Sequence, residues 1–226
     1  MSRLEAQMIM PIRTLMTAEM GLDFAAQEVT AGYGIADLVG TAFDEENCLQ
    51  RERMSLSIAL DHYYLIAVLT TLHRSKRTSL QYVLERVDIS ESTLRKLILP
   101  KLTHLGLIER YRDGYIRLFA DIPSPVQRIV SVEAKQTRWR EAIIQARRYT
   151  FFSDQTYIAI WSDALHRVDR ALLYRHRLGL ISVTPEIAEI VIEAPSRRPR
   201  RCEMHRYCAE MLYGKMLAQT ALSPIL

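Results

Sequence analysis

The segment Ile129–Lys135 reads Ile-Val-Ser-Val-Glu-Ala-Lys, and the interpretation of the whole chain starts from it. Its apolar, β-branched residues predict a strand over Ile129–Glu133. Successive side chains of a strand point to opposite faces, so Glu133 and Lys135 are expected on the same face. A carboxylate and an ammonium group would then lie together at the end of an otherwise apolar strand.

Helices and strands alternate after this segment. A helix is predicted over Trp139–Tyr149, and it places Gln145 and Tyr149 one turn apart on one side. The other predicted elements are a strand at Tyr157–Trp161, a helix at about Ala164–Arg175, strands at Leu180–Val183 and Ile190–Ile192, and a helix at Cys202–Leu217. This alternation indicates an α/β fold.

The beginning of the chain adds a second carboxylate. Apolar residues at helical spacing predict a helix in the first twenty residues, which kinks or begins at Pro11. Phe24–Val29 and Ile35–Gly40 are short apolar runs on either side of the Gly-rich sequence Ala31-Gly32-Tyr33-Gly34, so they predict a β-hairpin. Asp37 is the one carboxylate inside the second run.

Asp37, Glu133 and Lys135 suit metal-assisted hydrolysis of a phosphodiester. Two carboxylates on adjacent strands can hold Mg²⁺ and leave positions for water and phosphate. The metal polarises the phosphate and promotes formation of the attacking hydroxide. A nearby lysine can orient the water or stabilise negative charge in the transition state. Taken singly, each residue also has a structural interpretation, as an aspartate beside a turn or as part of a salt-bridged strand face.

These residues resemble the D…E-X-K signature of the PD-(D/E)XK nuclease superfamily. Gln145-x-x-x-Tyr149 is similar to the Q-x-x-x-Y motif of its RecB-like branch, and Glu28 resembles an additional acidic residue beside the metal. The resemblance covers about Gln7–Gly40 and Ile122–Val191. It implies a mixed central sheet flanked by helices, a Mg²⁺ (or Mn²⁺) site at Glu28, Asp37 and Glu133, and catalysis by Asp37, Glu133, Lys135, Gln145 and Tyr149.

The sequence departs from the family pattern in three respects. Ala36 stands where the family signature nominally has proline. No N-terminal histidine motif of the RecB-like exonucleases is found, which leaves the choice between endonuclease and exonuclease open. The long interval between Asp37 and Glu133 is explained by an inserted module, because a module whose ends lie close together can enter a surface loop.

The interval 46–121 is predicted to be that module, and 1–45 with 122–226 the α/β core. Leu56–Leu72 and Leu80–Val87 predict helices, and Ser90 is placed to cap a third helix, which Pro100 should bend or interrupt. Leu107–Tyr111 and Tyr115–Phe119 flank an Asp-Gly turn, a strong hairpin signal. This order resembles a winged helix-turn-helix, which places its third helix in the DNA major groove.

Several polar and basic residues are candidates for contact with DNA. The resemblance implies such contacts for Ser92, Thr93, Arg95 and Lys96 in the third helix and for Arg112 in the wing. Arg147 and Arg148 are expected to hold a nucleic-acid backbone beside the active site. Arg197-Arg198-Pro199-Arg200-Arg201 is interpreted either in the same way or as a solvated loop. Winged helices also bind proteins, so that alternative stays open.

Bulk properties limit the other possibilities. The 226 residues carry a formal net charge of +4, and no apolar stretch is long enough to span a membrane. The N-terminal residues do not resemble a signal peptide, and three scattered cysteines do not predict a disulfide framework, so a cytoplasmic location is expected. Cys202-x-x-His205-x-x-Cys208 lacks a fourth ligand for zinc.

Three functions therefore compete. The first is a DNA endonuclease that works as a homodimer or within a larger DNA-processing complex. The second is a winged-helix transcription regulator whose nuclease-like core is inactive and mediates dimerisation. The third is an adaptor that brings a partner protein to DNA. Intact Asp37, Glu133 and Lys135 favour the first, because inactive relatives usually lose a metal ligand.

Overall fold

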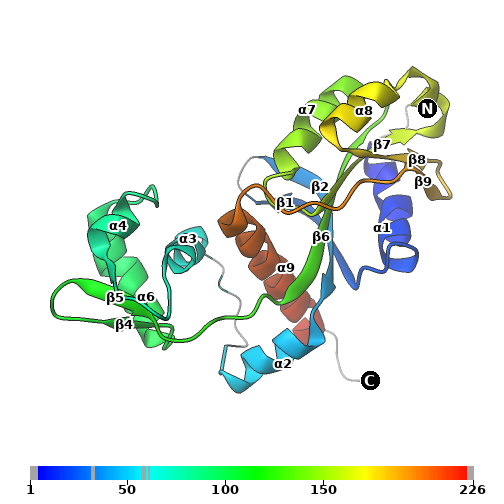
Figure 1. The fold of residues 1–226 in the computed structure, drawn as a ribbon. Coiled ribbons are helices and arrows are strands. Elements are labelled where there is room, and N and C mark those ends of the chain that lie inside the picture. Colours follow the sequence, from blue (N-terminus) through cyan, green and yellow to red (C-terminus); the bar gives the residue numbers. More distant parts are fainter. Residues whose placement is uncertain (1–4, 32–33, 57–59, 61, 223–226) are drawn as a thin grey trace.

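The fold is α/β, with a mixed six-stranded sheet flanked by helices (Figure 1). The computed structural model describes residues 5–31, 34–56, 60 and 62–222. The strand order is β1-β2-β6-β7-β8-β9, where β6, β7 and β8 are parallel and the other neighbours are antiparallel. The strands are β1 (Phe24–Thr30), β2 (Ile35–Phe43), β6 (Val126–Lys135), β7 (Gln155–Trp161), β8 (Gly179–Val183) and β9 (Ala188–Ile192).

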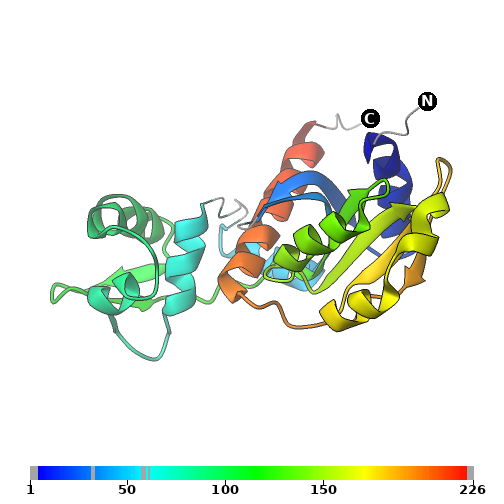
Figure 2. The same ribbon diagram turned by 90° about the horizontal axis from the view of Figure 1, so that it is seen from above.

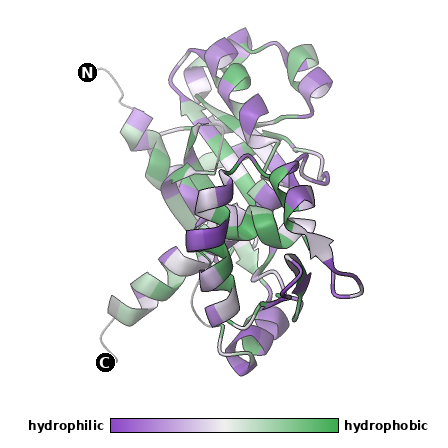
Figure 3. Cartoon of the chain, turned by 90° about the vertical axis from the view of Figure 1, so that its left-hand side faces the viewer, coloured by the Kyte–Doolittle hydropathy of each residue, from purple (hydrophilic) through white to green (hydrophobic). Residues whose placement is uncertain are grey.

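Helices cover both faces of this sheet. On one face, η1 (Glu5–Met8) and α1 (Ile9–Ala18) bury Met8, Ile12 and Leu15 against the strands. On the other face lie α7 (Trp139–Tyr149), η3 (Ser162–Arg167), α8 (Arg170–His176) and the long α9 (Cys202–Leu222). The central strands are mainly hydrophobic, whereas the outer helices carry many hydrophilic residues (Figure 3). Apolar side chains of the helices pack against both faces of the sheet, as a layered α/β core requires.

A second group of elements stands apart from the sheet (Figures 1 and 2). It contains α3 (Tyr63–Thr71), β3 (Thr78–Ser79), α4 (Leu80–Leu84), α5 (Glu91–Thr93), η2 (Leu94–Ile98), α6 (Leu99–His104), β4 (Ile108–Arg110) and β5 (Tyr115–Leu118). The three strands form a small antiparallel sheet in the order β3-β5-β4. This group has its own hydrophobic cluster, which extends from Leu56 to Ile122. Figure 1 shows it as a separate lobe, and we call it the inserted lobe.

The helical segment of the inserted lobe that begins after Ser90 does not end at Pro100. The Ser90 hydroxyl accepts the Thr93 N–H at 3.1 Å, so Ser90 caps the helix as predicted. The helical residues continue to His104, but Leu94–Ile98 form a π-helical turn. Proline has no N–H and crowds the carbonyl four residues earlier, and a wider turn relieves that crowding. Pro100 was predicted to bend or interrupt the helix; it does not interrupt the helical residues, and a π-helical turn precedes it.

Further predictions differ from the structure. The helix expected at about Ala164–Arg175 is two elements, η3 and α8, which Val168 and Asp169 separate. Leu56–Leu72 was expected to be one helix, but the described helix begins at Tyr63, where the His62 side chain caps it. Residues 57–59 and 61 of the predicted helix lie outside the described residues. Gly32 and Tyr33 of the predicted hairpin turn also lie outside them. The sequence did not predict α2 (Glu45–Arg53), which Asp44 caps through the Asn47 N–H. Capping and charge placement form this helix, although it is strongly polar.

A buried ion pair attaches α2 to the α/β part. Arg51 and Glu210 of α9 are both fully buried, and two hydrogen bonds of 2.8 and 2.7 Å join their side chains. Glu210 also accepts the Leu60 N–H at 3.0 Å, and Arg51 donates to the Pro123 carbonyl at 3.1 Å. Leu60 and Pro123 lie on the two connections to the inserted lobe. One pair of side chains therefore holds both connections together.

Candidate active site

Strands β2 and β6 separate at the start of β2 and the end of β6, and we call this point the fork. The ladder between β2 and β6 ends at the pair Leu38 and Val132. One residue further on, the Asp37 carboxylate accepts the Ala134 N–H at 2.8 Å. A side chain thus takes the place of the next backbone partner, and the hydrogen bond of a buried N–H is kept. The fork directs Asp37 toward the end of β6.

Glu133 and Lys135 lie at this fork on β6. They alternate with Ala134 as predicted, and Lys135 Nζ is 2.8 Å from Glu133 Oε1 and 3.8 Å from Asp37 Oδ2. Glu133 is only 1% exposed and Lys135 only 8%. Pairing of β6 with β7 continues as far as Lys135 and Ile160, so the strand remains ordered beyond the fork. The structure therefore brings Asp37, Glu133 and Lys135 together.

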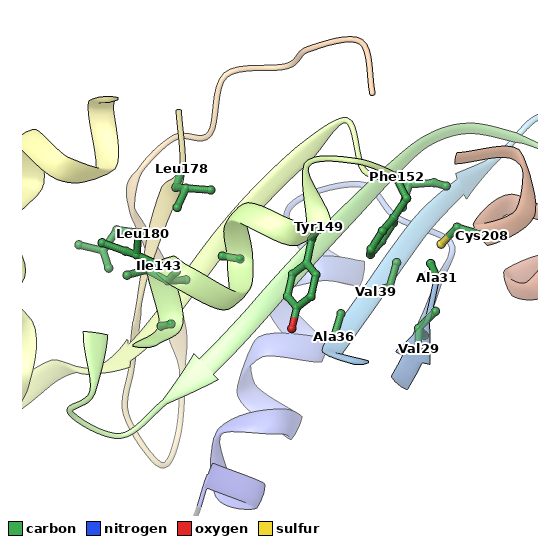
Figure 4. Close-up of a cluster of buried hydrophobic side chains, with 14 of the residues drawn as sticks. Val29, Ala31, Ala36, Val39, Ile143, Tyr149, Phe152, Leu178, Leu180 and Cys208 are labelled. Atoms are coloured by element: carbon green, nitrogen blue, oxygen red, sulfur yellow. The ribbon is translucent and has the colours of Figure 1, made fainter. Parts of the chain in front are cut away.

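Tyr149 reaches the same place from α7. Its ring is buried in the core between α7 and the sheet, and its hydroxyl points toward the start of β2 near Ala36 (Figure 4). The hydroxyl is hydrogen-bonded to the Glu133 carboxylate and lies 2.8 Å from the Ile35 carbonyl oxygen. One hydroxyl proton cannot serve two acceptors at once, so the hydroxyl donates either to the Glu133 carboxylate or to the Ile35 carbonyl.

Glu28 lies across the hairpin from Asp37, at a point where the strand pleat reverses. It has φ +50°, a left-handed conformation that costs a non-glycine residue about 1–3 kcal/mol. Ala26 and Val29 are three residues apart but bury their side chains in the same cluster, as do Ala36 and Val39. Strict alternation would place each pair on opposite faces. The reversal leaves Glu28 exposed beside Asp37.

Glu5 is the residue of this cluster that the sequence did not reveal. It lies on η1, and its carboxylate is 3.6 Å from Lys135 Nζ and 3.5 Å from Arg138. Glu5, Glu28 and Asp37 line a cavity of about 280 Å³ together with Ala134 and neighbouring residues of η1 and α1. No local motif marks Glu5, because its placement depends on how the N-terminal helix packs on the sheet.

Burial is the main cause of the pKa shifts at this site, and the neighbouring charges modify it. Burial raises the pKa of Asp37, and Glu5 and Glu28 add to that effect, although the Ala134 N–H and Lys135 oppose it. Burial also raises the pKa of Glu133 against the hydrogen bonds from Lys135 and Tyr149. Burial lowers the pKa of Lys135, but Glu133, Asp37 and Glu5 outweigh it and the net shift is upward. Burial and Glu133 raise the pKa of Tyr149, so it stays protonated.

The donor chemistry of this cluster fits a hard divalent cation. Glu5, Asp37 and Glu133 surround Lys135, and Glu28 lies beside Asp37; carboxylate oxygen is the ligand type that Mg²⁺ and Mn²⁺ prefer. Within the described ranges, no three acidic, histidine or cysteine side chains converge closely enough to form a metal-binding group by themselves. Asp37 and Glu133 are the two carboxylates that would contribute to such a site, with water and phosphate oxygens as further ligands.

The other predicted catalytic and backbone-binding residues of α7 have no hydrogen bond or ion pair with Asp37, Glu133 or Lys135 in the described structure. The Gln145 side chain is half-buried and makes no hydrogen bond with any other described residue, so its catalytic role stays a prediction. Arg147 and Arg148 are exposed and line a different concavity, beside Arg175 and Arg200. They do not line the cavity beside Glu5, Glu28 and Asp37, which we call the acidic cavity.

The predicted DNA-binding residues of the inserted lobe lie on its surface. Ser92, Arg95 and Lys96 are exposed on the helical segment after Ser90, and Thr93 is half-buried by its bonds to Ser90. Arg95 forms a surface ion pair with Glu91 at 2.7 Å, which is worth little in water and is easily exchanged for another anion. Arg112 is exposed at the turn between β4 and β5, where Gly114 has φ +80°.

Comparisons with known proteins add little. No protein-family model matches the sequence, and no curated protein matches it significantly. A solved structure with a similar course of chain is described as the SPO1766 protein of unknown function from Silicibacter pomeroyi. The match covers 97% of this chain and 90% of that chain, with 11% sequence identity and a TM-score of 0.48. No conclusion about the site rests on so distant a likeness.

No helix in the described part of the chain combines the length and the apolar character needed to cross a membrane.

Proposed function

We propose that this protein is a Mg²⁺- or Mn²⁺-dependent deoxyribonuclease that hydrolyses phosphodiester bonds of DNA. The observation that carries the proposal is the fork at the start of β2, where Lys135 lies within 4 Å of both Asp37 and Glu133 and Asp37 bonds the Ala134 N–H. Partial or full burial raises the pKa of both carboxylates, and ionisable groups perturbed in this way cluster at functional sites. The arrangement agrees with the expected D…E-X-K site of a PD-(D/E)XK nuclease.

Each residue has a distinct part in the proposed reaction. When bound, the metal ion would polarise the scissile phosphate and make water more acidic. Asp37 and Glu133 would hold that ion through carboxylate oxygens. The Lys135 ammonium group would orient the attacking water and stabilise charge on the phosphate oxygens. Tyr149 would keep Glu133 in place, because its hydroxyl bonds the carboxylate from the buried side.

The inserted lobe would bind the substrate duplex. Its order of helix, short strand, two helices and hairpin agrees with a winged helix-turn-helix, and Ser92, Arg95 and Lys96 face solvent on the candidate recognition helix. Arg112 at the hairpin turn would contact phosphate. Binding by the lobe and cleavage by the core would then be separable activities.

One observation favours the alternative function, a DNA-binding regulator or adaptor with an inactive core. Glu133 already has partners, since Lys135 and Tyr149 bond its carboxylate. A purely structural network would have this arrangement too. Cleavage and binding must therefore be measured on the same variants.

A plasmid assay tests the proposal. Supercoiled DNA is incubated with the full chain in Mg²⁺, in Mn²⁺ and in EDTA, and duplex binding is measured in EDTA by fluorescence anisotropy. Wild type should cleave only with metal. Asp37→Asn, Glu133→Gln and Lys135→Met should each lower the cleavage rate about a hundredfold or more and leave binding unchanged.

The matched control is Glu19→Gln, an exposed glutamate after the last residue of α1. This control should cleave like wild type. Cleavage by Glu133→Gln at the wild-type rate would refute the site. Duplex binding by wild type without cleavage in either metal would support the regulator instead.

A further inference from the structure

A second concavity carries only positive charge. It has a volume of about 440 Å³, and arginines from three segments line it: Arg147 and Arg148 on α7, Arg175 and Arg177 at the end of α8, and Arg197 and Arg200 on the connection from β9 to α9. This connection passes the ends of α7 and α8 on its way to α9 (Figure 2). We call this concavity the arginine pocket. Its volume is that of a small-molecule site, about 300–1,000 Å³.

The arginine pocket lacks a balancing anion within the protein. No acidic residue lines it, and none of its six arginines forms an ion pair with a carboxylate of the described residues. Its half-buried His176 has a lowered pKa because of burial, Arg147 and Arg175. The formal charge of the whole chain is only +4, so this surface concentrates positive charge.

Arg197 gives the most specific evidence. Its Nε and Nη2 atoms are buried and have no hydrogen-bond partner in the described structure. Burial, together with Arg200 and Arg177, lowers the pKa of Arg197 to about 10, so it remains charged at neutral pH. The Arg197 side chain as a whole is half-buried, and charged donor atoms that are buried without a hydrogen-bond partner cost stability. Such a group is expected where an external anion completes the site.

The backbone around the arginine pocket is held in place before any ligand binds. The Arg197 N–H donates to the Asp154 carbonyl at 3.0 Å, and the Arg200 N–H donates to the Thr150 carbonyl at 3.3 Å. These bonds attach the connection to the end of α7. Arg177 occupies the left-handed position after α8, with φ 56°, where glycine is usually found. A glycine there would remove one of the six charges.

We propose that the arginine pocket binds closely spaced phosphate groups, such as those of a nucleoside triphosphate or of a nucleic-acid strand. Guanidinium groups match phosphate oxygens with paired, charge-assisted hydrogen bonds. Six such charges exceed what a single phosphate can neutralise, so a chain of phosphates fits better. The pocket lies on the α7 and α8 face of the sheet and shares no lining residue with the acidic cavity, which lies beside η1 and α1. The proposal therefore does not depend on the proposed nuclease activity.

Binding of defined probes to the full chain tests this site. Inorganic tripolyphosphate, ATP and a single-stranded DNA oligonucleotide are titrated by calorimetry or anisotropy in EDTA. Arg197→Leu should weaken tripolyphosphate binding roughly tenfold or more, because it removes charged hydrogen bonds. The matched control is Arg198→Leu, an exposed neighbour on the same connection that does not line the pocket, and it should bind like wild type.

The two phosphate sources give different results. If the oligonucleotide competes with tripolyphosphate and loses affinity in Arg197→Leu, the phosphates belong to a strand; if ATP alone does so, they belong to a nucleotide. Equal binding of all three probes by Arg197→Leu and Arg198→Leu would overturn the proposal. Arg197→Leu should melt no lower than wild type, since it removes buried donor atoms that have no hydrogen-bond partner. If Arg197→Leu does not fold, the double variant Arg147→Ala, Arg200→Ala replaces it; both positions are exposed, and this variant should show the same loss of tripolyphosphate affinity.

Discussion

The buried pair Arg51 and Glu210 makes a quantitative prediction about stability. Glu210→Ala should destabilise the protein by about 3–5 kcal/mol, because it leaves the fully buried Arg51 cation without a counter-ion. The Leu60 N–H would also lose its acceptor. Arg51 would keep its bond to the Pro123 carbonyl and its position over the Tyr213 ring, 5.2 Å from the centroid, which limits the loss.

The same reasoning predicts partial recovery in a double variant. Arg51→Met combined with Glu210→Leu removes both charges and keeps the volume apolar, a change that is often neutral for a buried pair. The Leu60 N–H and the Pro123 carbonyl would remain unpaired, at a cost of about 1–3 kcal/mol each. We therefore expect the double variant to be more stable than Glu210→Ala but less stable than wild type.

Urea unfolding is a suitable assay because the probe is local. Both tryptophans, Trp139 and Trp161, lie in the α/β part, so their fluorescence reports unfolding of that part. Circular dichroism of the same samples shows whether the inserted lobe unfolds with it. Glu141→Ala is the control, since Glu141 forms an exposed ion pair with Arg138 at 2.9 Å and should change stability by less than about 1 kcal/mol.

Two results would refute this reasoning. One is a loss below about 1 kcal/mol in Glu210→Ala, equal to the control, which would mean that water reaches Arg51. The other is a double variant less stable than Glu210→Ala, which would mean that shape rather than charge determines the cost. An unchanged dependence of the unfolding free energy on urea concentration is needed for either comparison.

Two further predictions concern the acidic cluster and the inserted lobe. Burial raises the folded-state pKa of Asp37, so the wild-type protein loses stability as pH rises from about 4 through that raised pKa. Asp37→Asn should therefore have a higher melting temperature than wild type at pH 7 but not at pH 4. A lower melting temperature of Asp37→Asn at pH 7 would contradict this. Arg95→Ala with Lys96→Ala should weaken duplex binding and reduce its salt slope by roughly 0.9 for each lost phosphate contact. The control variant Arg53→Ala with Lys215→Ala, at exposed positions on α2 and α9, should bind the duplex with the affinity and salt slope of wild type. An equal loss of affinity in both double variants would argue for non-specific attraction.

Local sequence determined the elements that carry the candidate site. The alternation in Ile129–Lys135 predicted the shared face of Glu133 and Lys135, and the spacing of Trp139–Tyr149 predicted the helix that brings Tyr149 to Glu133. The Ser90 cap and the Asp113-Gly114 turn were also predicted. All of these depend on backbone geometry and on neighbours a few residues apart, so the sequence contains their full cause.

Only the tertiary structure decided which distant groups meet. Packing of η1 on the sheet brings Glu5 to the acidic cluster. Arg51 pairs with Glu210, which is 159 residues away in the sequence. The arginines of the arginine pocket come from three separate segments. The π-helical turn before Pro100 and the left-handed Glu28 are likewise local distortions that the surrounding fold imposes. These features arise because burial of apolar faces places segments side by side, and charges on those segments then become neighbours without any pattern that links them along the chain.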